Sequence, residues 1–303
     1  MNDQSCVCTN SLKRRLNTPG NLIRVMGAHN ALGARLIETT GFDGVWASSL
    51  EITTACGHVD DDTHILSDVL PISQQMASSC RLPIVADCGT GGELSAEIGT
   101  LVRSFEQAGV TAICLEDARW PKSNSLLPGE HDLMPTSEFA GKIETASRAR
   151  RSAEFAVIAR LEALVAGAGL AEALWRGREY VAAGADAILI HSKSDTPGEV
   201  LAFVHAWDDP APLVLIPTTY HVVTANELLN SGKVRMVIYA NQGMRAAIAA
   251  MKKVLARILD DGTSHYVENC IATLAEVFEI QADFQKNLNG KRWRNSPIRL
   301  EKA

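Results

Sequence analysis

The feature that most constrains the fold is a recurring unit in which an amphipathic run ends in glycine and an apolar run follows. In one copy, residues 98–105 place their apolar side chains on one helical face, Gly109 follows, and residues 111–115 form an apolar run of strand length. Glycine after a helix readily adopts the left-handed backbone conformation that closes helices. The same order recurs around Gly41 and Gly184. The pattern predicts helices that alternate with buried strands.

These apolar runs recur along the whole chain. We expect strands at residues 22–28, 45–47, 84–88, 111–115, 155–159, 187–190, 213–217 and 236–240. Strands that are apolar throughout and alternate with helices are typical of a parallel sheet covered on both faces. About eight such units favour a closed (β/α)₈ barrel over an open doubly wound sheet. No Gly-x-Gly-x-x-Gly motif opens the first helix, which further disfavours a dinucleotide-binding fold.

The expected organisation is one large domain. It has an N-terminal segment at residues 1–20, the barrel at 21–261, and a C-terminal helical extension at 262–303 that belongs to the same domain. The extension contains an amphipathic run around residues 271–280 and a polar, basic tail. No stretch is rich enough in Pro, Gly or Ser to mark a linker.

Charge and composition exclude several classes of protein. The net charge is −6 and no block of Lys and Arg stands out, so we expect no nucleic-acid partner. No apolar stretch approaches the length of a membrane span, and residues 1–18 lack the apolar run of a signal peptide. The seven cysteines, including Cys6-x-Cys8, show no zinc-ligand spacing. We expect a soluble cytoplasmic protein with reduced thiols.

Polar residues follow most of the predicted strands. In a parallel barrel these strand ends meet at one mouth, where active sites of this fold lie. In chain order they are Ser48, Asp87, Glu116, Arg160, Glu162, His191, Thr218 and Asn241. Asp87 and Glu116 could hold Mg²⁺, Arg160 offers a fork for a carboxylate, and His191 can donate to an oxyanion. Taken singly, each could equally be a loop cap or a structural hydrogen-bonding group.

Two loops add candidate chemistry. Residues 56–62 end in three adjacent carboxylates, Asp60 to Asp62, which could supply a nucleophile or a base. Residues 118–131 form a loop long enough to be a lid over the mouth. From composition alone, both could also be solvated surface.

Several runs resemble the phosphoenolpyruvate mutase family of the isocitrate lyase/phosphoenolpyruvate mutase superfamily. They are Gly44–Ser49, Leu115–Asp117 with Pro121–Leu126, Val157–Ala163 and Gly184–Lys193. The resemblance extends from about Leu22 to Leu259. It implies a (β/α)₈ barrel whose last barrel helix is swapped between subunits, in a homodimer or a homotetramer.

The resemblance also implies an enzyme that interconverts phosphoenolpyruvate and phosphonopyruvate with Mg²⁺, in a setting such as phosphonate biosynthesis. It implies a metal site at Asp87 and Glu116 and a catalytic carboxylate, Asp60, that accepts or stabilises the phosphoryl group. The remaining implied residues are Trp46, Ser48, Arg160 and His191, which would contact substrate oxygens, and Lys122, Asn124 and Ser125, on a gating loop that takes part in catalysis.

Two positions depart from the family pattern. The family has Asp-Ala-Asp-Thr-Gly after the third strand, whereas this chain has Asp87-Cys-Gly-Thr-Gly91, so that Gly89 replaces the second carboxylate. Gly27 stands where a mutase often has Glu. One acid fewer predicts a weaker metal site.

Three alternatives remain open. Phosphonopyruvate hydrolase has Thr at the place of Asn124, yet residues 190–197 and 202–204 look as much like the hydrolase as the mutase. A carbon–carbon lyase is disfavoured because its Lys-x-Cys-Gly-His loop is absent. A barrel that binds a phosphonate or keto acid without turnover would account for Gly89. The mutase is the favoured interpretation.

Overall fold

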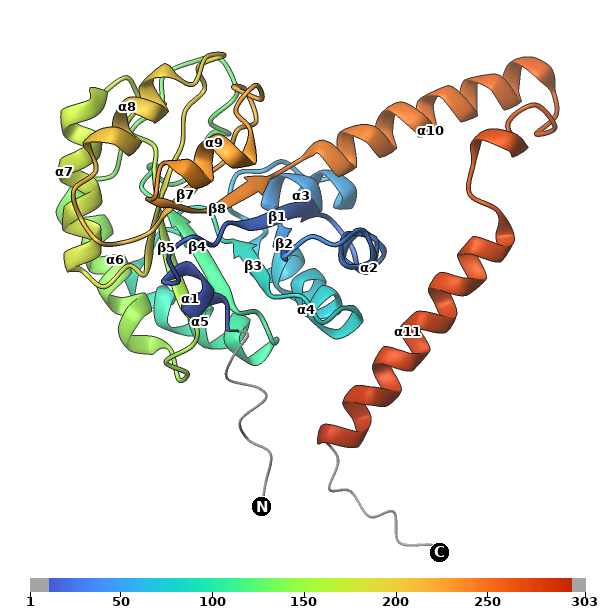
Figure 1. The fold of residues 1–303 in the computed structure, drawn as a ribbon, viewed down its shortest axis with the longest axis horizontal. Helices are drawn as coiled ribbons and strands as arrows, with labels where there is room; N and C mark the ends of the chain where they lie inside the picture. The colour runs from blue at the N-terminus through green and yellow to red at the C-terminus, as the bar shows by residue number, and fades with distance from the viewer. Residues whose placement is uncertain (1–10, 296–303) are drawn as a thin grey trace, which may run out of the picture.

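Eight parallel strands close into one barrel in sequence order, as the sequence predicts (Figure 1). The computed structural model describes residues 11–295. The strands are β1 (Ile23–Ala28), β2 (Gly44–Ala47), β3 (Ile84–Asp87), β4 (Ala112–Glu116), β5 (Ala156–Leu161), β6 (Ala187–Ile190), β7 (Leu213–Leu215) and β8 (Val234–Tyr239). β8 pairs with β1, which completes the closure.

Alternation along each strand divides the core into two layers. On β2, Trp46 belongs to the layer inside the barrel, whereas Val45 and Ala47 belong to the layer between the strands and the helices. Successive side chains of a strand point to opposite faces, so a barrel strand covered by helices buries the side chains of both faces. All residues of β2 to β7 are buried.

Helices pack around the strands and connect them. They are α2 (Ala31–Thr40), α3 (Ser49–Cys56), α4 (Leu70–Ser79), α5 (Ile98–Gln107), α6 (Thr136–Ala149), α7 (Gly169–Ala182), α8 (Gly198–Ala206) and α9 (Ala225–Asn230). Gly41 closes α2 at a φ of 93°, as the repeated unit predicts. A short helix, α1 (Leu12–Leu16), precedes the barrel, and its Leu12 and Leu16 are buried against the inner layer.

The last two helices leave the barrel. α10 (Gln242–Asp261) projects away from it, and α11 (Leu274–Asn295) runs back so that it contacts α4 (Figure 1). No residue of α10 is buried. α11 includes most of the predicted amphipathic run at 271–280 but continues well beyond it. Within residues 11–295, no helix combines the length and apolar character needed to cross a bilayer. Cys6, Cys8 and the end of the basic tail lie outside the described residues.

Candidate active site

The strand ends gather a buried polar cluster at one mouth of the barrel. The buried members are Ser48, Asp87, Glu116, Arg160, Glu162, His191 and Asn241, while Thr218 is half-buried. Each of these residues lies at the end of a strand or shortly after it, and every strand except β1 contributes at least one. The convergence predicted from the sequence is therefore present.

A cavity opens at this mouth. Its walls include Trp46, Ser48, Asp60, Asp87, Lys122, Asn124, Ser125, Arg160 and His191, which are all of the predicted site residues except Glu116. The space between the lining atoms, open mouth included, amounts to about 470 Å³. Glu116 is buried beside the cavity and contacts it through Lys122 and Arg160. A mostly polar cavity of this size suits a small anionic substrate.

The loop after α3 carries two acids back into the mouth. α3 ends at Gly57, and the chain then turns so that Asp60 and Asp62 are buried while Asp61 is only half-buried. Asp62 has a φ of 72°, an uncommon conformation for a residue other than glycine. Its Oδ2 accepts a hydrogen bond from the backbone N–H of Thr90 at 2.8 Å. The family resemblance implies a role for Asp60 alone among the three acids.

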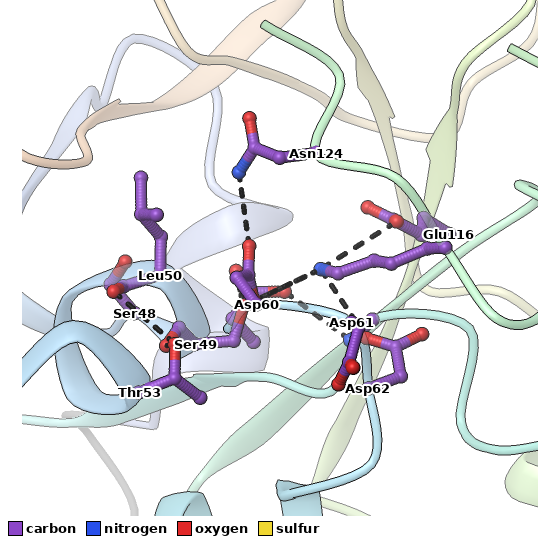
Figure 2. A network of polar contacts seen from close by, with 12 residues as sticks. Ser48, Ser49, Leu50, Thr53, Asp60, Asp61, Asp62, Glu116 and Asn124 are labelled. Carbon is purple, nitrogen blue, oxygen red and sulfur yellow. Dashed lines mark hydrogen bonds and ion pairs between the residues drawn. The ribbon is translucent and has the colours of Figure 1, made fainter. Parts of the chain in front are cut away.

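Lys122 lies among these acids. Its Nζ is 3.3 Å from Asp62 Oδ1, 3.5 Å from Asp60 Oδ1 and 3.7 Å from Glu116 Oε1. Burial by itself would lower the pKa of Lys122, but the surrounding carboxylates outweigh burial and raise the pKa well above its ordinary range. Lys122 therefore stays charged and neutralises part of the cluster. Figure 2 shows Asp60, Asp62 and Glu116 around the same centre.

Part of the long loop after β4 lies over the mouth, although residues 126–130 are exposed. Lys122 and Ser125 are buried, and Asn124 is half-buried. Asn124 Nδ2 donates a hydrogen bond to Asp60 Oδ2 at 3.0 Å, as Figure 2 shows. Ser125 Oγ accepts one from Arg160 Nη2 at 3.0 Å. For these three residues the alternative of a solvated surface loop is wrong.

Arg160 organises the opposite wall. Its Nε donates to Glu162, Nη1 lies 3.3 Å from Glu116 Oε2, and Nη2 lies 3.0 Å from His191 Nδ1. Burial lowers the pKa of His191, which favours the neutral imidazole. For Glu162, burial would raise the pKa, but Arg160 and His191 prevail and hold it below its ordinary value. This wall offers one strong cation and one imidazole to an anionic ligand.

The donor set fits a magnesium ion. Three buried carboxylate oxygens, Asp60 Oδ1, Asp62 Oδ1 and Glu116 Oε2, have no hydrogen-bond partner among the described residues. Asp87 is held in place because its Oδ2 accepts a hydrogen bond from Ser49 Oγ at 3.0 Å. Burial raises the pKa of Glu116 to about 8, although Lys122 and Arg160 both act to lower it. Oxygen ligands suit Mg²⁺, which typically binds one or two carboxylates together with waters and substrate oxygens.

Sequence reasoning missed two residues of this site. Ser49, which follows the predicted Ser48, orients Asp87. Asp62 lies as deep in the cluster as Asp60 does. The acid triplet was a visible signal, but nothing in the spacing showed that the loop would turn two of its three side chains inward.

Known proteins match this chain over most of its length. Residues 12–259 match the profile of the family described as phosphoenolpyruvate phosphomutase. A phosphonopyruvate hydrolase from Variovorax sp. (strain Pal2) is 42% identical over 265 residues, which cover 87% of this chain and 91% of the relative.

Solved structures agree with that match. A phosphoenolpyruvate phosphomutase from Streptomyces platensis subsp. rosaceus superimposes with a TM-score of 0.88 at 45% identity, covering 94% of this chain and 99% of that one. A phosphonopyruvate hydrolase in complex with oxalate and Mg²⁺ gives a TM-score of 0.85 at 39% identity, covering 94% and 98%. The resemblance in the motifs is thus confirmed, and the chain belongs to the phosphoenolpyruvate phosphomutase family, within the phosphoenolpyruvate mutase/isocitrate lyase superfamily.

Proposed function

We propose that this enzyme is a phosphoenolpyruvate mutase, which interconverts phosphoenolpyruvate and phosphonopyruvate. The observation that carries the proposal is the hydrogen bond of 3.0 Å from Asn124 to Asp60, made by a loop that lies over the cavity. A loop that contacts the reacting carboxylate keeps water away from it. Exclusion of water is what a mutase needs in order to return the phosphoryl group to pyruvate.

The proposed reaction begins from phosphonopyruvate. An oxygen of Asp60 attacks phosphorus, the P–C bond breaks, and its electron pair passes into the carbonyl to give the enolate of pyruvate. The enolate oxygen then attacks the phosphorus of the aspartyl phosphate, which forms phosphoenolpyruvate and regenerates the carboxylate. Arg160 and His191 stabilise the negative charge of the enolate, and Trp46 and Ser48 shape the wall that binds it.

Mg²⁺ would be held by Asp87 and Glu116, with further carboxylates nearby, and would supply positive charge to the substrate oxygens. The protein's own residues keep the groups apart and oriented. Lys122 neutralises the acids from the loop side at distances of 3.3 to 3.7 Å. Asn124 fixes one oxygen of Asp60, which leaves the other free of hydrogen bonds from the described residues.

Phosphonopyruvate hydrolysis is the second candidate, because a hydrolase is 42% identical to this chain. In that reaction water, rather than the enolate, attacks the phosphoryl group. The same Asp60, Arg160 and His191 serve both reactions, so the cavity walls favour neither. The contact between Asn124 and Asp60 favours the mutase.

The decisive experiment is phosphorus NMR of the purified enzyme with phosphonopyruvate and Mg²⁺. Formation of phosphoenolpyruvate supports the mutase, whereas inorganic phosphate with pyruvate shows a hydrolase. An Asp60→Asn variant is the matched control, since it keeps the size of the side chain but removes the nucleophile. If the wild type binds phosphonopyruvate and forms neither product, the proposed function is wrong and a non-catalytic barrel or a lyase is favoured.

We also propose that the enzyme assembles into a homodimer or homotetramer by exchanging α10 between subunits. α10 exposes Ile248, Met251, Leu255 and Leu259, and none of its residues is buried. Long exposed apolar stripes are unusual on monomers and mark association surfaces. Sedimentation of the wild type and of a Leu255→Glu variant tests this: a smaller species is expected for the variant, and a monomeric wild type contradicts the proposal.

A further inference from the structure

The starting observation is the space around Gly89. This residue has a φ of 52°, and a Cβ built on it would lie 1.8 Å from Asp62 Oδ1 and 2.4 Å from Asp62 Cγ. No side chain at position 89 can coexist with the carboxylate of Asp62 in its present place. The carboxylate of Asp62, which comes from a different loop, therefore occupies the space that a Cβ at position 89 would take.

Asp62 is held in this place by specific contacts. It adopts a φ of 72°, a conformation that residues other than glycine occupy at a cost in backbone energy. The N–H of Thr90, the residue after Gly89, donates to Asp62 Oδ2 at 2.8 Å. This hydrogen bond thus joins the loop that carries Asp62 to the turn after β3, next to Gly89.

The other oxygen of Asp62 points into the polar cluster. Asp62 Oδ1 is buried and accepts no hydrogen bond from the described residues. Lys122 Nζ lies 3.3 Å from this oxygen and 3.7 Å from Glu116 Oε1. Asp62 and Glu116 therefore face one common region, which Lys122 enters from the loop after β4.

The charge of the cluster leaves room for a divalent cation. Five buried carboxylates, Asp60, Asp62, Asp87, Glu116 and Glu162, outnumber the buried cations near them, Lys122 and Arg160 in the mouth and Lys142, which interacts with Asp62. An excess of buried carboxylates is costly unless a further cation or protons compensate it. Excess negative charge strengthens the binding of Mg²⁺, which explains a charged side chain at position 62. A side chain that only packed the loop would not need a charge.

A similar arrangement occurs at Gly27, the second position that departs from the family pattern. A Cβ there would lie 3.0 Å from Glu51 Oε1, which is also buried and without a hydrogen-bond partner among residues 11–295. The backbone oxygen of Ala240, 2.1 Å away, excludes a side chain at Gly27 as well. At both glycines an acid from a neighbouring element lies beside the place of the acid that is absent.

We propose that Asp62 is a metal-site residue that takes over the role of the carboxylate missing at position 89. The predicted weakening of the metal site by Gly89 is then offset by an acid that enters from the loop after α3. This proposal rests on the proposed use of Mg²⁺ but not on which product the enzyme forms.

The test measures metal binding without turnover. Mn²⁺ is titrated into the metal-free enzyme in the absence of substrate, and bound Mn²⁺ is followed by electron paramagnetic resonance. Asp62→Asn is expected to weaken Mn²⁺ binding by about 10- to 100-fold. Asp61→Asn is the matched control, because Asp61 accepts its hydrogen bonds from Thr63 and should leave the affinity unchanged.

A swapped variant separates the role of the acid from its effect on folding. Asp62→Gly combined with Gly89→Asp moves the carboxylate back to the strand end, and Asp tolerates a left-handed backbone better than most residues. The swap should regain most of the affinity that Asp62→Asn loses, while Gly89→Asp alone should destabilise the protein because both carboxylates compete for one space. Thermal unfolding in EDTA identifies variants that do not fold.

The outcomes distinguish this proposal from the proposed function. Unchanged Mn²⁺ affinity in a folded Asp62→Asn variant overturns the role of Asp62, whatever the enzyme does to phosphonopyruvate. Loss of affinity that the swap restores supports it, even if phosphorus NMR shows no phosphoenolpyruvate. A wild type that binds no Mn²⁺ overturns both this role and the metal in the proposed mechanism.

Discussion

Two adjacent acids at the end of β4 have opposite environments. Asp117 points toward α7, where it accepts hydrogen bonds from Arg176 Nη1 at 3.0 Å, from the Tyr180 hydroxyl at 2.8 Å and from the backbone N–H of Glu162 at 2.8 Å. Glu116 points into the mouth, where Lys122 Nζ lies 3.7 Å from Oε1 and Arg160 Nη1 lies 3.3 Å from Oε2, and Oε2 has no hydrogen-bond partner within the described chain. Both acids are fully buried in the protein.

The difference shows how burial of charge can serve structure or function. A buried carboxylate whose oxygens are all hydrogen-bonded adds rigidity, because its removal leaves buried donors without an acceptor. A buried carboxylate with an unbonded oxygen is a place where the protein leaves a group for a ligand. By this criterion the Asp117 network is structural, whereas Asp60, Asp62 and Glu116 at the mouth each leave one oxygen for a ligand.

The largest expected effect is on activity, at Asp60. Asp60→Asn should lower turnover of phosphonopyruvate by at least about 10³-fold, because loss of a nucleophile removes the covalent route. Its thermal stability should stay the same or rise, since one charge of an acid-rich cluster is removed. Product formation by phosphorus NMR and thermal unfolding of the same sample check both parts. A variant that loses activity only because it unfolds would contradict the comparison.

The next effect is on stability, at Arg176. Arg176→Met should lower the free energy of unfolding by about 3–5 kcal/mol, because Asp117 is left as an unpaired buried charge. Urea unfolding measures the loss. Adding Asp117→Asn to the variant should recover part of it, whereas activity per folded molecule should change little. An equal loss in the double variant would show that packing, rather than charge, holds this network.

A smaller effect is expected at the loop contact. Asn124→Ala removes one donor to Asp60 and should cost about 1–2 kcal/mol of transition-state stabilisation, close to tenfold in rate. Because the loop then excludes water less well, the share of inorganic phosphate among the products should rise. The ratio of phosphoenolpyruvate to phosphate measures this share. An unchanged ratio would remove the argument for the mutase that rests on this residue.

The smallest expected effect is on stability, at Asp43, an acid that lies away from the mouth and serves as a reference for the buried acids. Partial burial would raise the pKa of Asp43, but hydrogen bonds from Arg24 and Arg15 outweigh it and lower the pKa below its ordinary value. A lowered pKa stabilises the folded state above the unfolded pKa, and this contribution is lost as the pH falls. Asp43→Asn should therefore cost about 1 kcal/mol or less at pH 7, since the group is partly exposed.

Urea unfolding of Asp43→Asn and of the wild type across pH gives the check. The difference between them should be constant above about pH 5 and shrink below about pH 4. A difference that instead grows in acid would show that the sign of the interaction at Asp43 is wrong.

The fold could be predicted from sequence because the barrel repeats one local rule eight times. Most strands are apolar on both faces, and every strand except β1 delivers polar groups to the same mouth, so the positions of Asp87, Glu116, Arg160 and His191 follow from spacing alone. The inward turn of Asp62 could not be predicted, because it depends on a left-handed residue and on the space that Gly89 leaves in another loop. Contacts between loops are set by tertiary packing and leave no periodic signal.

The path of α10 could not be predicted from the same rules either. Its pattern is that of an ordinary amphipathic barrel helix, yet none of its residues is buried. An apolar stripe indicates that a helix face is covered but does not show which surface covers it.

Asn241 gives the position of α10 a consequence for catalysis. This residue lines the cavity, precedes the first residue of α10, and its Oδ1 is 3.4 Å from Arg245 Nη1 within that helix. A partner that binds α10 would therefore also restrict the motion of Asn241 in the cavity wall. If association of subunits through α10 provides this restriction, dissociation on dilution should lower activity. The rate per enzyme molecule would then fall as the enzyme concentration is lowered.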